Sequence, residues 1–145
     1  MIQRFQDFVT GITACYKYIQ RIKSMEMTEF GLKGTQVMCI FFLQHNSEGL
    51  TASQLCQLCA EDKAAISRTL ATLQKQGYIL TGEKKYRTPL YLTDKGRALA
   101  SQMDGLIQQW VGCGGNGLSD EERATFYRAL GQIAGNLRQN INNLP

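Results

Sequence analysis

The sequence has few of the side chains from which catalytic and metal sites are usually built. It contains one histidine, His45, and it has no glycine-rich phosphate loop, no paired carboxylates and no nucleophile motif. A single histidine at the end of a helix is more often a cap or a surface group than a metal ligand or a base. We therefore expect a protein that is not an enzyme and that carries neither a cofactor nor a metal.

Long apolar runs are also missing. The longest, such as residues 37–43, fall far short of the roughly 20 residues that a membrane-spanning helix needs. The first residues do not have the pattern of a secretory signal. The five cysteines are an odd number spread through apolar helical segments, which argues against the disulfide framework of a small secreted protein. These features predict a cytoplasmic protein with reduced thiols and no membrane partner.

The charge of the chain is unevenly distributed. The formal net charge is +4. Eight basic and four acidic residues lie between Thr51 and Arg97, whereas the rest of the chain carries eight of each sign. A localised basic excess indicates a polyanionic partner, because neutralising phosphates releases counterions. A solvated basic surface is the alternative at this point.

The spacing of apolar residues predicts a mainly α-helical fold with a small β-hairpin. Residues 35 to about 45 are apolar on nearly all sides, which is typical of a buried central helix. An N-terminal helix precedes it and has one apolar stripe, which would pack on its own domain or on a second chain. The members of this stripe are three or four residues apart: Phe5, Phe8, Ile12, Cys15, Ile19 and Ile22.

Two short helices joined by a tight connection are expected next. Thr51 can cap a helix that reaches about Cys59, and the connection follows at residues 60–61. Asp62 can then place its carboxylate on the free amides of a second helix, which runs to about Gln76.

A β-hairpin follows the second short helix. Residues 78–81 and 88–92 are rich in β-forming side chains, and the polar, basic segment 82–87 lies between them. Pro89 cannot donate a hydrogen bond to a strand ladder, so the second strand should lie at an edge or be irregular.

Two further helices close the predicted order of elements. The first begins after Thr93 and runs to about Val111, and the four glycines within residues 112–117 predict a flexible break. Ser119 and Glu122 form a capping box that opens the last helix. One face of this helix carries four apolar residues: Phe126, Leu130, Ile133 and Leu137.

Two short helices followed by a hairpin form a winged helix-turn-helix, in which the second helix enters the major groove of DNA. Its apolar side, Ile66, Leu70 and Leu73, should pack inward together with Leu55, Leu58 or Cys59. Small residues at positions 64, 65 and 71 would allow close approach to the groove, and the basic hairpin could reach the adjacent minor groove or backbone. The candidate DNA-binding residues are Lys63, Ala64, Ser67, Arg68, Lys84, Lys85 and Arg87.

Several segments of this region resemble the MarR family. They are residues 50–55 (LTASQL), 66–70 (ISRTL), 73–79 (LQKQGYI) and 92–98 (LTDKGRA), and the close of the hairpin at 92–96 is the most specific of them. Arg87 matches the arginine that the family carries in its wing. Lys85 stands where the family usually has an acidic residue, and the wing is a few residues short.

The resemblance implies a single MarR-like domain over residues 1–145. Its DNA-binding lobe would span about 35–97, and residues 1–28 and 98–145 would form dimerisation helices. It also implies a homodimer that binds a near-palindromic operator in double-stranded DNA, and repression that a small molecule relieves. The effector pocket would lie where the first, second and fifth helices meet, with these candidate residues: Ile12, Cys15, Met38, Phe42 and Met103.

Other interpretations remain open from the sequence alone. In a peroxide-sensing branch of the family an N-terminal cysteine near tyrosines is the sensor, and Cys15 lies beside Tyr16 and Tyr18. Cys56 and Cys59 share a helix face, but no second ligand pair with zinc spacing exists, which favours buried structural thiols over a metal site. The fold could also serve as a protein-interaction module. Such a module would not need basic residues on both the second short helix and the hairpin.

Overall fold

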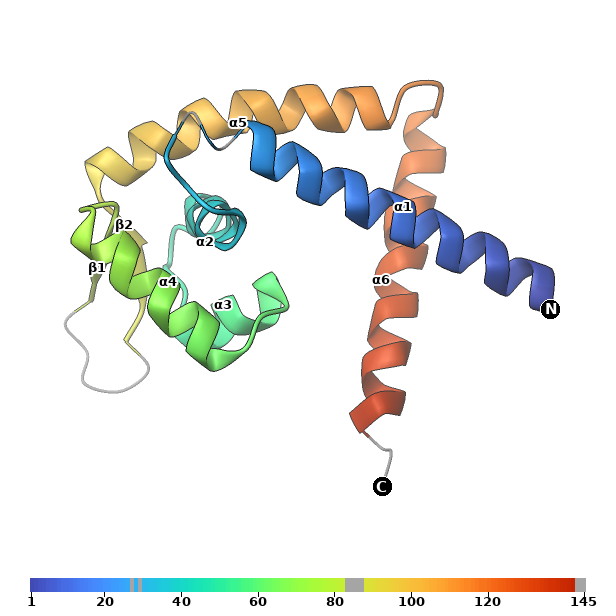
Figure 1. Ribbon diagram of the computed structural model, residues 1–145, viewed down its shortest axis with the longest axis horizontal. Coiled ribbons are helices and arrows are strands. Elements are labelled where there is room, and N and C mark those ends of the chain that lie inside the picture. The colour runs from blue at the N-terminus through green and yellow to red at the C-terminus, as the bar shows by residue number, and fades with distance from the viewer. Residues whose placement is uncertain (27, 29, 83–87, 143–145) are drawn as a thin grey trace. The chain divides into compact units, whose positions relative to one another are not determined.

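The computed structural model describes residues 1–26, 28, 30–82 and 88–142. Eight elements follow one another along the chain (Figure 1): α1 (Ile2–Glu26), α2 (Gly34–Gln44), α3 (Ala52–Cys59), α4 (Lys63–Lys75), β1 (Ile79–Thr81), β2 (Leu90–Leu92), α5 (Asp94–Gly114) and α6 (Asp120–Asn142). This order confirms the predicted class, a mainly α-helical winged helix-turn-helix with a small hairpin. The chain divides into two compact units, Met1–Leu106 and Ile107–Pro145.

Helix α2 is the centre of the first unit. Its side chains are apolar nearly all round, and the helix contacts α1, α3, α4 and β2. Cys39 and Ile40 have no exposed surface, and neither do Leu55 of α3 and Ile66 of α4. Burial of side chains of this size is worth about 1.5–3 kcal/mol each. The core thus holds both short helices against α2.

The hairpin strands are shorter than predicted. β1 and β2 pair antiparallel, with Leu80 opposite Tyr91. The second strand begins only after Pro89, whose ring nitrogen has no hydrogen to donate but whose carbonyl accepts from the amide of Gly82 at 2.8 Å. Leu50, just before α3, adds a one-residue bridge to Leu90 through two backbone hydrogen bonds of 2.9 and 3.2 Å. This bridge fixes the start of α3 to the hairpin.

Helix α1 carries much more exposed apolar surface than a buried stripe would. Phe5 is 67% exposed and Ile19 is 49% exposed, whereas Phe8, Ile12 and Ile22 are partly covered. Within the first unit α1 makes its main contacts with α2 alone. The predicted stripe is therefore only partly buried in this chain.

The second unit shows a longer α5 than expected. The predicted break at residues 112–117 begins too early, because α5 continues to Gly114 and the amide of Gly115 still donates to the carbonyl of Val111 at 3.0 Å. Continued backbone hydrogen bonding outweighs the helix penalty of about 1 kcal/mol per glycine. The capping box opens α6 as predicted, with the Ser119 amide donating to a Glu122 carboxylate oxygen at 2.8 Å.

Helix α6 packs little within its own unit. None of its residues, Asp120–Asn142, is buried in the described chain. Its large apolar side chains include five that are between 37% and 64% exposed: Phe126, Tyr127, Ile133, Leu137 and Ile141.

Candidate nucleic-acid interface

Two side-chain caps fix where the two helices of the helix-turn-helix begin. Thr51 and Gln54 form a capping box at the start of α3, with the Gln54 amide donating to the Thr51 hydroxyl at 3.3 Å. The Asp62 carboxylate accepts from the amide of Ala65 at 2.7 Å and begins α4. Between the helices Ala60 adopts the left-handed conformation, with φ of 54°. The predicted connection and both predicted caps are therefore present.

Helix α4 has one buried and one exposed face. Ile66 and Leu73 have no exposed surface, and Leu70 is 7% exposed. The opposite face is open, so the chain itself covers none of its outward side chains, which are Lys63, Ala64, Ser67, Arg68 and Ala71. Of the three α3 residues considered for inward packing, Leu55 is fully buried and Cys59 is half-buried. Leu58 is 45% exposed and does not pack inward.

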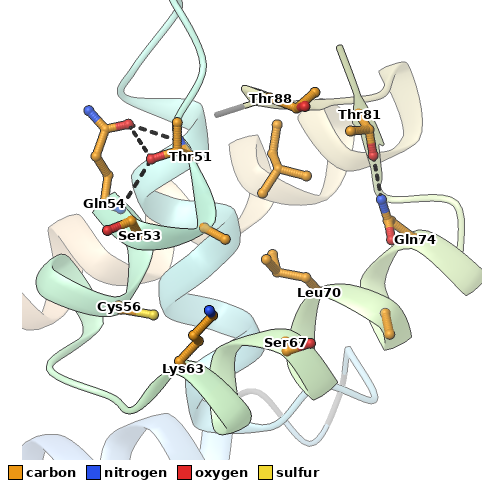
Figure 2. Close-up of a pocket in the computed structure, with 13 residues that line it drawn as sticks. Thr51, Ser53, Gln54, Cys56, Lys63, Ser67, Leu70, Gln74, Thr81 and Thr88 are labelled. Atoms are coloured by element: carbon orange, nitrogen blue, oxygen red, sulfur yellow. Dashed lines mark hydrogen bonds between the residues drawn. The ribbon is translucent and has the colours of Figure 1, made fainter. Parts of the chain in front are cut away.

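A groove of about 1170 Å³ separates α3, α4 and the hairpin strands. Lys63 and Ser67 line it from α4, Ser53 lines it from α3, and Thr81 and Thr88 line it from the hairpin side (Figure 2). Lys63 is the charged side chain among the described residues that line the groove, and most of the others are hydroxyl or amide groups. Such groups can donate to phosphate oxygens and to base edges.

The far end of α4 is joined to the first strand. Gln74 of α4 donates from its side-chain amide to the hydroxyl of Thr81 at 2.6 Å, and both residues line the groove (Figure 2). Gln74, Ser53 and Thr81 are not among the residues predicted to bind DNA. Gln74 could have been found, since it continues the helical spacing of Lys63 and Ser67. Ser53 and Thr81 could not, because their places depend on how α3 and the hairpin pack.

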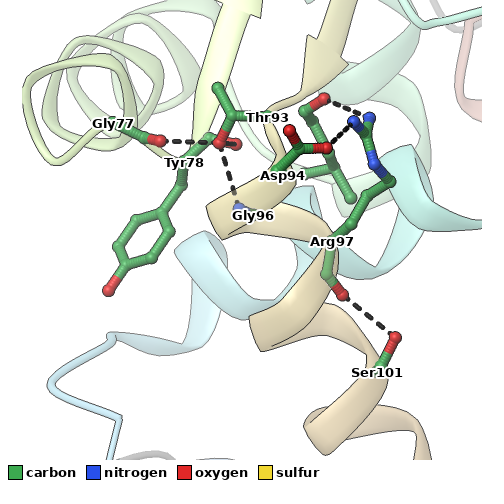
Figure 3. A network of polar contacts seen from close by, with 8 residues as sticks. Gly77, Tyr78, Thr93, Asp94, Gly96, Arg97 and Ser101 are labelled. Atoms are coloured by element: carbon green, nitrogen blue, oxygen red, sulfur yellow. Dashed lines mark hydrogen bonds and ion pairs between the residues drawn. The ribbon is translucent and has the colours of Figure 1, made fainter.

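A polar corner holds β2 and α5 against the end of α4 (Figure 3). The Thr93 hydroxyl donates to the carbonyl of Gly77 at 2.7 Å and accepts from the amide of Gly96 at 3.0 Å. Arg97 donates to the carbonyl of Leu92 at 2.8 Å and pairs with Asp94. Residues 92–96, the most specific part of the resemblance to the MarR family, thus position the hairpin and do not line the groove.

Three of the predicted DNA-binding residues, Lys84, Lys85 and Arg87, lie outside the described residues. The structure describes the hairpin up to Gly82 and again from Thr88. Lys63 and Ser67 lie together at the groove, while Ala64 and Arg68 are exposed on the same helix without lining it.

Of the five residues predicted to line the effector pocket, one lines the cavity found near them. A cavity of about 390 Å³ lies between α1, α2 and the end of α3, and Met38 lines it together with Tyr16, Lys23, Cys59 and Glu61. The other four predicted pocket residues do not line this cavity: Ile12, Cys15, Phe42 and Met103. Met103 is completely buried, whereas Cys15 is exposed in the single chain.

The cavity has a distinct charge environment. Partial burial lowers the pKa of Lys23, an effect that the nearby Cys59 and Glu61 oppose. The Sγ atoms of Cys39 and Cys59 lie 3.9 Å apart. Hydrogen bonding from Cys39 lowers the pKa of Cys59, whereas the same contact and burial raise the pKa of Cys39. Cys59 is therefore the thiol that ionises first.

Metal-binding and membrane features can be stated for residues 1–26, 28, 30–82 and 88–142. Within them, no group of three or more His, Cys, Asp or Glu side chains could hold a metal ion. None of the described helices is long and apolar enough to cross a membrane. His45 caps the end of α2 and pairs through Nε2 with Asp104 of α5 at 3.1 Å, which is a structural contact.

Comparison with known proteins agrees with this geometry. One similar structure is that of a putative MarR family transcriptional regulator from Listeria monocytogenes complexed with 26mer DNA. Its sequence is 19% identical to this one and the TM-score is 0.83. The match covers 91% of this chain and 89% of the other chain. A MarR family regulator from Silicibacter pomeroyi is 22% identical, with a TM-score of 0.79 and 86% of each chain covered. The S. aureus MepR–DNA complex is 17% identical, with a TM-score of 0.75, covering 87% of this chain and 93% of its own.

The sequence also matches a family model. Residues 30–84 match the model described as MarR family, and a search of curated proteins found no match. The fold and the groove define a winged helix-turn-helix protein. The match to the MarR family model covers the helix-turn-helix part of the chain, and the fold over most of the chain is the one seen in structures of MarR family regulators.

Proposed function

We propose that this protein is a sequence-specific regulator of transcription that binds double-stranded DNA through α4. The observation that carries the proposal is the open face of α4, where Lys63, Ser67 and Arg68 are exposed beside a polar groove. Lys63 and Arg68 can donate to guanine edges or phosphates, and small Ala64 leaves room for close approach. Two similar folds are described in complex with DNA, which supports the same use here.

The proposed functional unit is a homodimer in the cytoplasm. A near-palindromic operator requires two α4 helices about 34 Å apart, one helical turn of DNA. The exposed apolar side chains of α1 and α6 suit an interface between two copies, because one chain leaves them uncovered. Lys84, Lys85 and Arg87 are proposed to contact the flanking minor groove or backbone.

We propose that the regulator is a repressor released by a small molecule. A ligand can shift a protein between two states only by its difference in affinity for them. The cavity beside Met38 touches both α1 and the end of α3, so an occupant there could alter how α4 is presented. Release of bound DNA by an added compound would be the direct readout.

The test is selection of bound sequences from random duplex DNA at several salt concentrations. We expect a two-fold-symmetric site. Arg68→Ala should relax one base position per half-site and cost about 1–3 kcal/mol at that position. Lys75→Ala removes the same charge from the last turn of α4 and should leave the base preference unchanged. Equal weakening of all sequences by Arg68→Ala would contradict the role of Arg68, and an absence of any selected site would contradict the function.

A further inference from the structure

The end of α3 brings two cysteines from different helices together. Cys39 comes from the middle of α2 and has no exposed surface, while Cys59 is the last residue of α3 and is half-buried. Their Sγ atoms are 3.9 Å apart, close to van der Waals contact. A disulfide needs about 2.05 Å between the sulfurs, so closure by about 1.9 Å would join them.

One member of the pair, Cys59, lines a cavity. Cys59 lines the 390 Å³ cavity together with Lys23 and Glu61, whereas Cys39 lies behind it and does not line the cavity. A small oxidant entering this cavity would therefore meet Cys59 first. The hydrogen bond from Cys39 lowers the pKa of Cys59, and Lys23 acts in the same direction, whereas burial and Glu61 oppose them.

We propose that Cys39 and Cys59 form an intrachain redox site, in which a hydroperoxide oxidises Cys59 and Cys39 resolves it to a disulfide. The Cys59 thiolate attacks one peroxide oxygen, the O–O bond breaks, and hydroxide leaves and takes up the proton that Cys59 had released. The resulting sulfenic acid is attacked by Cys39, whose proton leaves with the second hydroxide. Two thiols and one hydrogen peroxide thus give one disulfide and two waters.

The position of Cys59 couples this bond to the DNA-facing helix. Ala60 follows it in a left-handed conformation with φ of 54°, and Asp62 then begins α4. Cys39 is held in the most buried helix of the unit, so closure of the two sulfurs would move mainly the end of α3 and the turn. This consequence for DNA rests on the proposed function, whereas formation of the disulfide does not.

The chemical test treats the full chain with hydrogen peroxide, alkylates the remaining thiols and maps the bond by mass spectrometry. Trypsin alone leaves Cys39, Cys56 and Cys59 on one peptide, so a second cleavage after Glu48 is needed to separate Cys39. We expect a Cys39–Cys59 bond that is lost in Cys59→Ser and retained in Cys56→Ser and Cys15→Ser. A bond that involves Cys56, or no bond within the chain, overturns the proposal.

The functional test measures affinity for the selected operator before and after oxidation. We expect a loss of about 5–150-fold, the usual range for coupling between two sites, with recovery on addition of dithiothreitol. Cys59→Ser, Cys39→Ala and the double variant should be insensitive to peroxide. Circular dichroism checks that each variant folds. If Cys39→Ala does not fold, the comparison of Cys59→Ser with the wild type is the test. Unchanged affinity of a protein shown to hold the bond overturns the coupling. If the reduced protein binds no DNA and the oxidised protein still forms the Cys39–Cys59 bond, only the proposed function is contradicted.

Discussion

A single glycine fixes the junction between the hairpin and α5. A Cβ atom at Gly96 would lie 2.1 Å from the backbone oxygen of Tyr78 and 3.1 Å from its carbonyl carbon. The Tyr78 carbonyl is held in place, because it accepts from the backbone amide of Thr93 at 3.0 Å and the Thr93 hydroxyl accepts from the Gly96 amide at 3.0 Å (Figure 3). The conformation of Gly96 is ordinary, so the requirement for glycine comes from close approach alone.

Gly96→Ala should therefore lower the free energy of unfolding by about 1–3 kcal/mol or more, as overpacking against fixed atoms does. Gly105→Ala is a matched control in the same helix, since no atom lies within 4 Å of its added Cβ. It should be neutral or should raise stability by up to about 1 kcal/mol through helix propensity. Urea unfolding followed by circular dichroism measures both. Equal stability of the two variants would show that the corner is looser than the distances indicate.

At the scale of elements, the starts of helices with a capping side chain were predicted most accurately from the sequence. Thr51 and Asp62 gave the starts of α3 and α4 to the residue, because a capping side chain acts within three residues of itself. The end of α5 was placed too early, at about Val111, since composition does not reveal whether backbone hydrogen bonds continue through a glycine. The groove was predicted only along α4. Its α3 and hairpin walls depend on contacts that are distant in sequence, such as the Leu50–Leu90 bridge.

The capping box of α6 gives a pH-dependent prediction. Hydrogen bonds from the backbone and hydroxyl of Ser119 lower the pKa of Glu122 below its ordinary value of 4.5. A lowered pKa in the folded state means that the stabilisation is complete above pH 4.5 and is lost as the pH falls through the folded value. The thermal midpoint of the wild type should exceed that of Glu122→Gln at pH 7, and the difference should shrink toward pH 3.

Glu121→Gln is the matched control for this measurement. Glu121 lies in the same first turn and shares the favourable helix-dipole position, but it does not take part in the capping box. Its midpoint difference from the wild type should be smaller than that of Glu122→Gln at pH 7. A difference for Glu122→Gln that stays constant from pH 7 to pH 3 would show that the ionised carboxylate does not stabilise the cap.

At the scale of the whole molecule, the exposed apolar surface supports the proposed homodimer. A side chain such as Leu137 on a helix with no buried residue is hard to reconcile with a protein that remains single in water. In a two-fold-symmetric dimer each exposed residue counts twice, because the same patch is used by both copies. Leu137 is 53% exposed, so burying the rest of it, at about 0.8–1.6 kcal/mol per copy, would contribute about 1.6–3.2 kcal/mol to association.

Leu137→Glu should accordingly weaken dimerisation by at least about tenfold and shift the protein toward monomers in sedimentation velocity. Arg138→Glu changes charge at the neighbouring position and should leave the dimer largely intact. Operator affinity should fall with the dimer, because one α4 helix can occupy only one half-site, and it should recover partly at high protein concentration. If Leu137→Glu remains dimeric while Phe126→Glu and Ile133→Glu do the same, α6 is not the interface, and the two α4 helices must be spaced by other surfaces.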